Sequence, residues 1–398
     1  MEKEESWGNV ITPAPPQMNT IPTLLLGIDE FTITLIPNEK IYNIDWKNIA
    51  ENQIQNFVKL FDVEQIMNGS LQEIETSKPQ GYTKAFNLGV KDYYIAFAYH
   101  EDLPDMGVCI RFSAKSWSIY QYQYMKTNNK KILISDLLRN FASSCSDFTV
   151  RLTRIDLTAD FYNYGLCLSD LFDKMKNSSI MIQNEHGKSP IRSISFYGKN
   201  SNVETIYIGS RKTNSKGFLR IYDKKKEQID TNGFRLEEAF STQDWVRFEA
   251  VFKGKYAHNI SDIMLSTSMN EKELSAFIAK LITQKYRLYD NDANDYLKAT
   301  TDLLEIASSS MCDALRNESP RDNSLHQSIS HLRCGSGFYP TLYKIEKLYG
   351  IGKLEKFLKD LYIEFCDRTW ITPSVQKELN MWLKKHADLI PEHLEENY

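Results

Sequence analysis

The residues with the clearest chemical potential lie in one stretch, where a tyrosine is followed by a glycine and by basic side chains. Tyr207 precedes Gly209 and Arg211, and Arg220 follows on the next β-type run. A tyrosine oxygen can attack phosphorus if nearby cations stabilise the phenoxide and the charge that grows on the phosphate oxygens. A glycine, which has no side chain, would let a bulky phosphodiester approach the backbone. The stretch therefore predicts phosphodiester cleavage through a tyrosyl intermediate.

Two strands must position these side chains. The sequence predicts them at Thr205–Arg211 and Gly217–Asp223, joined by a short polar turn. Because side chains alternate between the two faces of a strand, Tyr207 shares a face with the other odd-numbered residues of its run. On the second strand, Arg220 and Tyr222 share a face, and Tyr222 is the alternative nucleophile.

Two further strand patterns place acids and arginines together on polar faces. Arg154, Asp156 and Asp160 share a face of one strand, and Arg247 and Glu249 share a face of another. Carboxylates suit Mg²⁺ or Mn²⁺, which complete their shells with water and phosphate oxygens. Asp156 and Glu249 are the first candidate ligands, and Asp160 is a third. The alternative is that these acids form salt bridges with Arg154 and Arg247, and the sequence leaves both readings open.

Such an ion would help a phenol to act as a nucleophile. A free phenol has a pKa near ~10, and bringing it to neutrality requires about 4 kcal/mol of preferential stabilisation of the phenoxide. A bound divalent cation, with Arg211, Lys212 or Arg220 close by, can supply part of that stabilisation.

The chain is weakly acidic as a whole, with a net charge of −4, yet one stretch is strongly basic. From His186 to Glu227 there are ten Lys and Arg residues against three acidic ones. Phosphate binding depends on local charge, so this stretch predicts contact with DNA. The alternative is a solvated, lysine-rich strand edge that guards against aggregation. The candidate DNA-binding residues are Lys212, Lys216, Lys224, Lys225, Lys226, Arg154 and Arg247.

Several other kinds of site are disfavoured. The six cysteines have no paired spacing, which argues against a zinc site or a disulfide framework. The sequence contains no His-x-His pair, no Gly-x-x-x-x-Gly-Lys-Ser/Thr loop and no Gly-x-Ser-x-Gly motif. The apolar runs are too short to span a bilayer, and the opening Met-Glu-Lys-Glu-Glu is unlike a signal peptide. We expect a reduced, cytoplasmic protein with no membrane contact and no ATP-driven motor of its own.

The periodicity of the sequence predicts two folded parts. Residues 1–22 hold four of the twelve prolines and predict a flexible leader. Residues 23–260 predict an α+β catalytic domain with a largely antiparallel sheet, and residues 261–398 an all-helical C-terminal domain. Further strands are expected at Leu24–Ile36, Tyr93–Tyr99, Val108–Ser113, Leu152–Phe161, Ser193–Tyr197 and Trp245–Phe252, with helices at Trp46–Phe61, Ile134–Ala142 and Leu168–Lys176.

Helical spacing replaces strand alternation after His258. Apolar residues recur at helical intervals over Leu274–Ile282 and Leu354–Tyr362, and Asn270 with Glu273 resembles a capping box ahead of the first run. Thr372 followed by proline predicts the start of a further helix.

At residues 153–160, 205–213, 220–224 and 245–249 the chain resembles the rolling-circle replication initiators of Gram-positive plasmids, the Rep_trans type, and the related relaxases of conjugative elements. The resemblance covers residues 150–255 well and the N-terminal strands loosely. Thr213 departs from the serine that the family usually carries, which leaves a hydroxyl available. The matching pieces are Thr-Arg-Ile-Asp-Leu-Thr-Ala-Asp at 153–160, Thr-Ile-Tyr-Ile-Gly-Ser-Arg-Lys-Thr at 205–213 continuing to Arg-Ile-Tyr-Asp-Lys at 220–224, and Trp-Val-Arg-Phe-Glu at 245–249.

The resemblance implies site-specific nicking of one DNA strand at an origin. Tyr207 matches the tyrosine that would keep the 5′ phosphate as a covalent ester, and Asp156 and Glu249 match acids suited to hold a metal ion. Arg211 and Arg220 would clamp the scissile phosphate. A host helicase is an implied partner because nicking alone does not unwind DNA, and we expect a homodimer.

Three alternatives stay open. The first is a relaxase that begins conjugative transfer, although no helix-turn-helix is evident before Leu24 and a plasmid-type initiator is favoured. The second is a sequence-specific DNA-binding protein without catalysis, which would not need Tyr207. The third is a metal-dependent nuclease that uses water and would cut DNA after Tyr207→Phe.

Overall fold

Apolar and polar residues alternate along the long strands, which gives the central sheet one face for the core and one polar face. In β6 (Phe148–Tyr162), Leu157 and Phe161 are buried among apolar neighbours, whereas Asp156 and Asp160 point to the opposite face. The computed structural model describes residues 20–38, 45–76, 78–90, 93–191, 193–199, 202–212, 215–312, 315, 325, 329, 332–333, 337–368 and 370–385.

Ten strands form this antiparallel sheet in the order β2-β3-β4-β5-β1-β6-β11-β10-β9-β8. The long strands β1 and β6 lie at its centre and pair with each other along most of their length. A second, small sheet has the order β13-β12-β7. The strands are β1 (Thr23–Pro37), β2 (Leu71–Glu73), β3 (Lys84–Val90), β4 (Tyr93–Tyr99), β5 (Val108–Phe112), β6, β7 (Ile180–Gln183), β8 (Ile194–Lys199), β9 (Asn202–Ile208), β10 (Gly217–Asp223), β11 (Trp245–Lys253), β12 (Arg287–Asp290) and β13 (Asp295–Tyr296).

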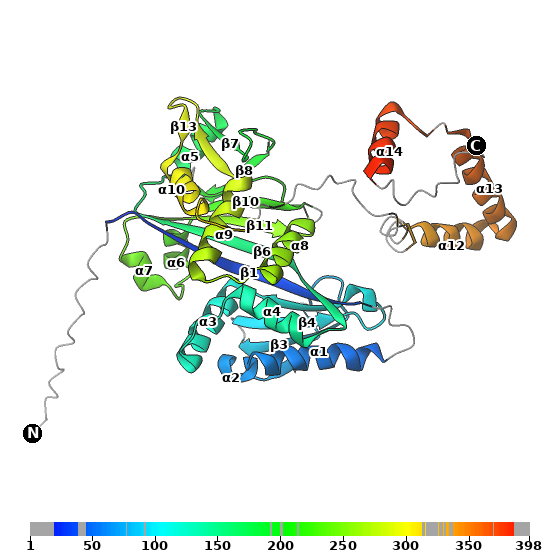
Figure 1. Ribbon diagram of the computed structural model, residues 1–398, viewed down its shortest axis with the longest axis horizontal. Helices are drawn as coiled ribbons and strands as arrows, with labels where there is room; N and C mark the ends of the chain where they lie inside the picture. The colour runs from blue at the N-terminus through cyan, green and yellow to red at the C-terminus, as the bar shows by residue number, and fades with distance from the viewer. Residues whose placement is uncertain are drawn as a thin grey trace, which may run out of the picture. The chain divides into compact units, whose positions relative to one another are not determined.

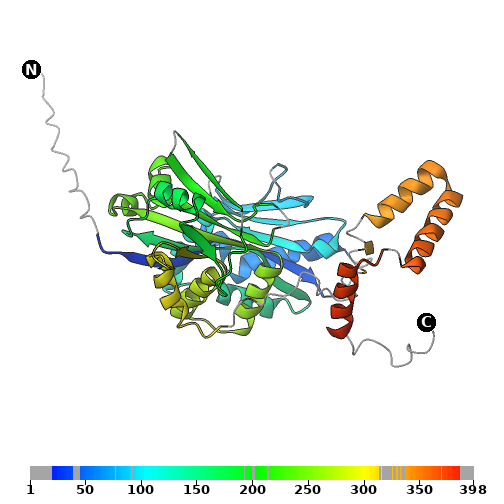
Figure 2. The ribbon, with the colours of Figure 1, turned by 90° about the horizontal axis from the view of Figure 1, so that it is seen from above.

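Helices cover the apolar face of the sheet. Figures 1 and 2 show α8 and α9 crossing the central strands, where they contact β6, β11 and β1. Helix α5 covers β9 and β10 on the same face. In the other half of the sheet α1 contacts β5, α2 contacts β3 and α3 contacts β4 and β1, while α4 contacts β6. The helices are α1 (Trp46–Leu60), α2 (Val63–Met67), α3 (Ala114–Asn128), α4 (Ile134–Ser144), α5 (Leu168–Lys176), α6 (Lys224–Asp230), α7 (Leu236–Phe240), α8 (Lys255–Ser266), α9 (Glu271–Lys285), α10 (Lys298–Ala307), α12 (Phe338–Tyr349), α13 (Ile351–Asp367) and α14 (Pro373–Lys385), with a 3₁₀ turn η1 at Pro104–Met106.

The chain divides into two compact units, Met1–Leu315 and Arg316–Tyr398. The sequence predicts a boundary after residue 260, and this position falls inside α8. Helices α8 and α9 belong to the first unit, because they are amphipathic and pack on its sheet. In the second unit, α12 packs on α13. The predicted leader at 1–22 lies outside the described residues except for its last three positions. None of the described helices is long and apolar enough to cross a bilayer.

The predicted fold class, α+β with a largely antiparallel sheet and helices in the C-terminal region, is confirmed. Local signals located the long elements well, and Asn270 caps α9 by accepting a hydrogen bond from the Glu273 backbone N–H at 2.9 Å. The sequence reading missed α3, whose apolar residues show weak helical periodicity, and the short helices α2, α6 and α7. It also missed the strands β2, β3, β7, β12 and β13.

A cluster of aromatic rings packs α1 and α4 against each other on the sheet. Phe57 has no exposed surface, and its ring centroid lies 4.8 Å from that of Phe61 and 4.8 Å from that of Phe141. We predict that Phe57→Ala lowers the free energy of unfolding by about 3–5 kcal/mol, because it leaves a cavity that rigid neighbours cannot fill.

Urea denaturation of Phe57→Ala and of a control variant, Phe234→Ala, checks this prediction. Phe234→Ala is the matched control, because Phe234 is 55% exposed and its removal should change the free energy of unfolding by less than about 0.5 kcal/mol. Equal midpoints for the two variants would contradict the packing role of Phe57.

Candidate active site

The polar face of the sheet carries a row of functional side chains across four adjacent strands. Tyr207 of β9 lies opposite Arg220 of β10, and Arg220 lies opposite Glu249 of β11. Glu249 in turn lies opposite Thr158 of β6. Directly opposite residues of antiparallel strands point to the same face, so the row is a property of the register. With neighbouring strands about 4.8 Å apart, Tyr207 and Glu249 lie about 10 Å from each other along the row.

Tyr207 is half-buried at the surface of this face. The guanidinium carbon of Arg211 lies 4.3 Å from the centroid of its ring, and the ring of Phe218 lies 6.4 Å away. No residue in the described part of the chain hydrogen-bonds to its hydroxyl. The phenol is thus outside the apolar core and next to a cation, as a nucleophile for phosphorus requires.

The strand that carries Tyr207 ends at a glycine for a conformational reason. Gly209 has φ +99°, a value that side-chain-bearing residues rarely adopt, and its N–H donates to the Ser193 carbonyl at 2.9 Å. This turn takes the chain out of the strand and leaves Arg211 exposed beside Tyr207. Glycine is required there by backbone geometry as well as by any need for space.

Arg220 and Glu249 form an ion pair in the middle of the row. One terminal nitrogen of Arg220 lies 2.6 Å from Glu249 Oε1, and Glu249 is only 2% exposed. Burial alone would lower the pKa of Arg220, but the Glu249 carboxylate outweighs it and raises that pKa. Burial raises the pKa of Glu249 above its usual range, in opposition to Arg220. The Nε of Arg220 is buried without a hydrogen-bond partner among the described residues, so the guanidinium keeps one unused donor.

The alternative nucleophile, Tyr222, has a different environment. It is 8% exposed, and its hydroxyl donates to Glu249 Oε2 at 3.2 Å. Burial raises its pKa well above the ordinary value for a phenol. Tyr222 therefore stays neutral and orients Glu249, which suits it less well than Tyr207 to attack a phosphodiester.

A second ion-pair cluster lies on the same face, beside the row that contains Tyr207. The guanidinium of Arg247 donates to both Asp160 oxygens, at 2.6 and 2.8 Å, and to Asp29 Oδ1 at 2.8 Å. Arg235 reaches the same Asp160 at 3.3 Å. Burial would raise the pKa of Asp160, but Arg247 outweighs it and the pKa falls below its usual range. The sequence reading missed Asp29 and Arg235; an acid pair inside the otherwise apolar β1 run was the signal for Asp29.

Asp156 forms a third charged group with Arg154. The guanidinium donates to Asp156 at 2.9 and 2.7 Å, and Arg154 also pairs with Glu30 at 3.0 Å. Burial raises the pKa of Asp156 to about 7, against the effect of Arg154 and with a further contribution from Glu249. The salt bridges that the sequence left as an alternative are thus present for Asp156 and Asp160, while Glu249 pairs with Arg220.

The carboxylates differ in how well they fit a divalent cation. Asp156 and Glu249 are buried, Glu249 contributes to the raised pKa of Asp156, and both residues carry the oxygen donors that Mg²⁺ or Mn²⁺ prefers. A cation there would relieve that repulsion, so these two residues fit an ion that keeps water and phosphate as its other ligands. Asp160 does not fit, because two arginines hold it. Among the described residues, no three His, Cys, Asp or Glu side chains converge as a ready-made metal cluster.

Some side chains of the basic stretch are exposed to solvent, and others contact the rest of the protein. Arg211 and Lys212 are exposed just beyond β9, and Lys216 is half-buried near the Tyr256 ring. Lys224 is only 8% exposed and pairs with Glu227 at 2.8 Å, so it faces the interior rather than an incoming polyanion. Lys225 donates to the backbone carbonyls of Thr242 and Gln243, and Lys226 pairs with Asp230 at 2.9 Å.

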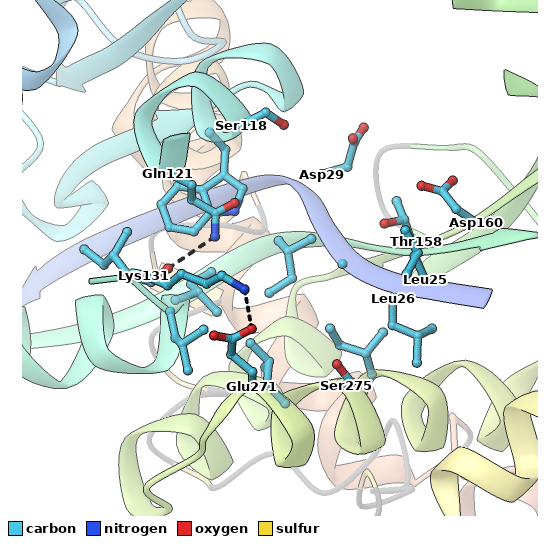
Figure 3. Close-up of a pocket in the computed structure, with 18 of the residues that line it drawn as sticks. Leu25, Leu26, Asp29, Ser118, Gln121, Lys131, Thr158, Asp160, Glu271 and Ser275 are labelled. Carbon is cyan, nitrogen blue, oxygen red and sulfur yellow. Dashed lines mark hydrogen bonds and ion pairs between the residues drawn. The ribbon is translucent and has the colours of Figure 1, made fainter. Parts of the chain in front are cut away.

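A pocket of about 420 Å³ opens beside the Arg247 cluster (Figure 3). The first part of β1 pairs with β6 but not with β5, so one edge of β1 is free there. The pocket lies along this free edge of β1 and is lined by α3 and α9. Lys131 and Glu271 form an ion pair at 2.6 Å across it, and Asp29 and Asp160 lie at the side of the polar face. The pocket therefore adjoins the functional row without containing Tyr207.

Comparison with known proteins shows that the central part of the chain is similar to a known family. Residues 150–303 match the Rep_trans family model, described as "Replication initiation factor", and the resemblance seen in the sequence is confirmed for this segment. The match includes β6, β9, β10 and β11, the four strands that carry the row. No curated protein sequence matches the chain.

Solved structures give weaker likenesses. A rolling-circle replication initiator protein from Geobacillus stearothermophilus is 12% identical, with a TM-score of 0.49, over 73% of this chain and 98% of that one. A putative C-terminal regulatory domain of an aspartate kinase from Porphyromonas gingivalis is 13% identical, with a TM-score of 0.13, over 46% of this chain and 84% of that one.

The buried pair Arg247–Asp160 should be a large contributor to stability of the first unit. We predict that Asp160→Asn lowers the free energy of unfolding by about 3–5 kcal/mol, because it leaves a buried guanidinium short of its counter-charge. Adding Arg247→Met to this variant should recover part of the loss, which a double-mutant cycle of urea denaturation measures.

The exposed Lys131–Glu271 pair supplies the control. Its side chains are 58% and 59% exposed, and Lys131→Ala should cost no more than about 1 kcal/mol. A loss for Asp160→Asn as small as that for Lys131→Ala would show that the buried pair is not needed for folding.

Proposed function

We propose that the protein is a site-specific DNA nicking and rejoining enzyme that initiates rolling-circle replication of a plasmid through a 5′-phosphotyrosyl intermediate. The proposal is supported most by one observation: the half-buried Tyr207 shares a row with Arg220 and Glu249 and lies under the Arg211 guanidinium. The family match over residues 150–303 includes all four strands of that row.

Tyr207 is the nucleophile of the proposed reaction. Its phenolic oxygen bonds to phosphorus as the bond between phosphorus and the 3′ oxygen breaks, so the enzyme keeps the 5′ phosphate as an ester. The phenol gives its proton to water, and the departing 3′ oxygen takes one up. Because the ester conserves the bond, attack by a 3′ hydroxyl restores the DNA strand without ATP.

The arginines stabilise charge during this exchange. Arg211 lies over the Tyr207 ring, and its exposed guanidinium is placed to meet a phosphate oxygen. Arg220 adds a second positive charge to the same row, beside Glu249. Glu249 and Tyr222 hold Arg220 in place. Exposed Lys212 contributes to binding of the DNA backbone, whereas buried Lys224 does not fit that role.

A divalent ion, Mg²⁺ or Mn²⁺, fits into this proposal as a cofactor held by Asp156 and Glu249. When bound, it would supply positive charge for the phosphate oxygens. Without the ion, Arg154 neutralises Asp156 and Arg220 neutralises Glu249. Both arginines would have to give up part of these contacts when the two carboxylates bind the ion. A host helicase is the proposed source of unwinding. The C-terminal helices are proposed to recognise the origin, to mediate self-association as a homodimer, or both.

The nucleophile is tested with supercoiled plasmid that carries the cognate origin. We predict that the wild-type protein with Mg²⁺ yields open circles with protein bound to a 5′ end, and that Tyr207→Phe yields neither product because no phenolic oxygen remains. Denaturing gels of labelled DNA measure the adduct. Tyr222→Phe is the matched control and should still form the adduct, since Tyr222 is buried and hydrogen-bonded.

The outcomes separate the alternatives. Loss of the adduct in Tyr222→Phe alone would move the nucleophile to Tyr222 while keeping the chemistry. Cleavage by Tyr207→Phe without any adduct would point to a nuclease that uses water. Binding of the origin with no cleavage by the wild-type protein would identify a non-catalytic DNA-binding protein, and genes for a transfer apparatus beside this one would favour a relaxase.

The cofactor proposal has a separate test. We predict that chelation of divalent ions stops nicking but leaves DNA binding, and that Glu249→Gln raises the Mg²⁺ concentration for half-maximal nicking by about tenfold, because a ligand charge is lost. Asp160→Asn should leave that concentration unchanged in the protein that remains folded. Equal Mg²⁺ requirements for Glu249→Gln and the wild type would refute the assignment.

A further inference from the structure

An exposed tyrosine stands beside the proposed nucleophile on the same face of the sheet. Tyr197 of β8 lies opposite Thr205 of β9, and Ser195 lies opposite Tyr207. Thr205 and Tyr207 are two residues apart on β9, so all four side chains point to the polar face. Tyr197 and Tyr207 are therefore diagonal neighbours, and their Cβ atoms lie about 7–8 Å apart or less.

The ring of Tyr197 is open to solvent. It is 57% exposed, and within the described part of the chain it has no aromatic or hydrogen-bonding partner. The neighbouring Phe196 is similarly exposed, at 55%, but it points to the other face and has a ring partner, because its centroid lies 4.6 Å from that of Phe172. Single exposed aromatic residues are common on protein surfaces, so the position of Tyr197 carries more weight than its exposure.

The other aromatic rings of this face are already occupied. The Tyr207 ring is covered by Arg211 at 4.3 Å, and Tyr222 is buried with the Arg220 guanidinium 4.9 Å from its ring. Phe218, on the same face, is half-buried, and the Nζ of Lys253 lies 5.3 Å from its ring centroid. Among the described rings next to Tyr207, Tyr197 is therefore the most exposed. It also lies on β8, the last strand in the order of the sheet (Figure 1).

We propose that Tyr197 binds single-stranded DNA by stacking on the base next to the scissile phosphate. Aromatic side chains on a sheet surface hold unpaired bases in this way, and the contact tolerates any base because each has a flat face. Tyr197 is a positioning residue: by fixing one base it sets the phosphate over Tyr207. This inference rests on the proposed function of the same site.

The test measures binding without cleavage, so it does not depend on turnover. Full-length protein carrying Tyr207→Phe is titrated with labelled oligothymidylate about 16 nucleotides long, near the upper single-strand site size. Adding Tyr197→Ala should weaken binding by about 5- to 150-fold, the effect of losing one base–aromatic stack. Adding Tyr197→Phe should leave the affinity unchanged, because the ring remains.

An abasic oligomer of the same length distinguishes stacking from a general loss of structure. It lacks bases, so Tyr197→Ala should not change its affinity. Tyr94→Ala, in the far half of the sheet, is the matched control: Tyr94 is 38% exposed, and its removal should leave binding of both oligomers unchanged.

Three results would overturn the proposal: unchanged oligothymidylate affinity in Tyr197→Ala, an equal loss on the abasic oligomer, or a loss in Tyr197→Phe, which would assign the effect to the hydroxyl. Failure of the wild-type protein to form a covalent adduct would refute the nicking function instead. That result would leave the binding comparison intact, so the two failures are distinguishable.

Discussion

The need to pair buried charges governs the polar face of this sheet. Asp156, Asp160, Arg247 and Glu249 are each no more than 5% exposed, and an isolated ion at such a depth would cost several kcal/mol. Each one is therefore held by an opposite charge from a neighbouring strand or from its own. The Arg247–Asp160 and Arg220–Glu249 pairs exist only when β6, β11 and β10 are in register, and β9, which carries Tyr207, pairs in turn with β10.

This pairing also explains how one surface can be both stable and reactive. The Arg247–Asp160 cluster is saturated by Asp29 and Arg235, so it serves as a rigid base for the face. The Arg220–Glu249 pair keeps a free donor at Arg220 Nε, and Glu249 has a raised pKa. Unsatisfied donors and perturbed carboxylates gather at functional sites, and here they lie next to the one tyrosine of the row.

Strand alternation was enough to predict the polar face and most of its residues. The patterns around Asp156, Tyr207, Arg220 and Glu249 gave the face of each side chain, because that depends only on local sequence. They did not give the partners, since pairing depends on strand order and register. For this reason the salt-bridge alternative named Arg154 and Arg247 as partners of the acids, whereas Glu249 pairs with Arg220 on β10.

The same limit applies to the fold. Helical periodicity located α9 and α13, but it could not say whether an amphipathic helix covers a sheet or joins a helical unit. The division at 315/316 follows from the packing of α8 and α9 on β1, β6 and β11, which is a long-range property. Asp29 and Arg235 were missed for the same reason, as they reach Arg247 and Asp160 from distant parts of the chain.

The central claim is that one phenolic oxygen on this sheet becomes bonded to DNA, and peptide mapping of the trapped adduct tests it most directly. Protein incubated with origin DNA and Mg²⁺ is digested with nuclease and protease, and mass spectrometry locates the tyrosine that retains a nucleotide. The account predicts that the nucleotide is on Tyr207 alone. A nucleotide on Tyr222 or Tyr197, or no modified peptide in a sample that is fully nicked, would contradict it.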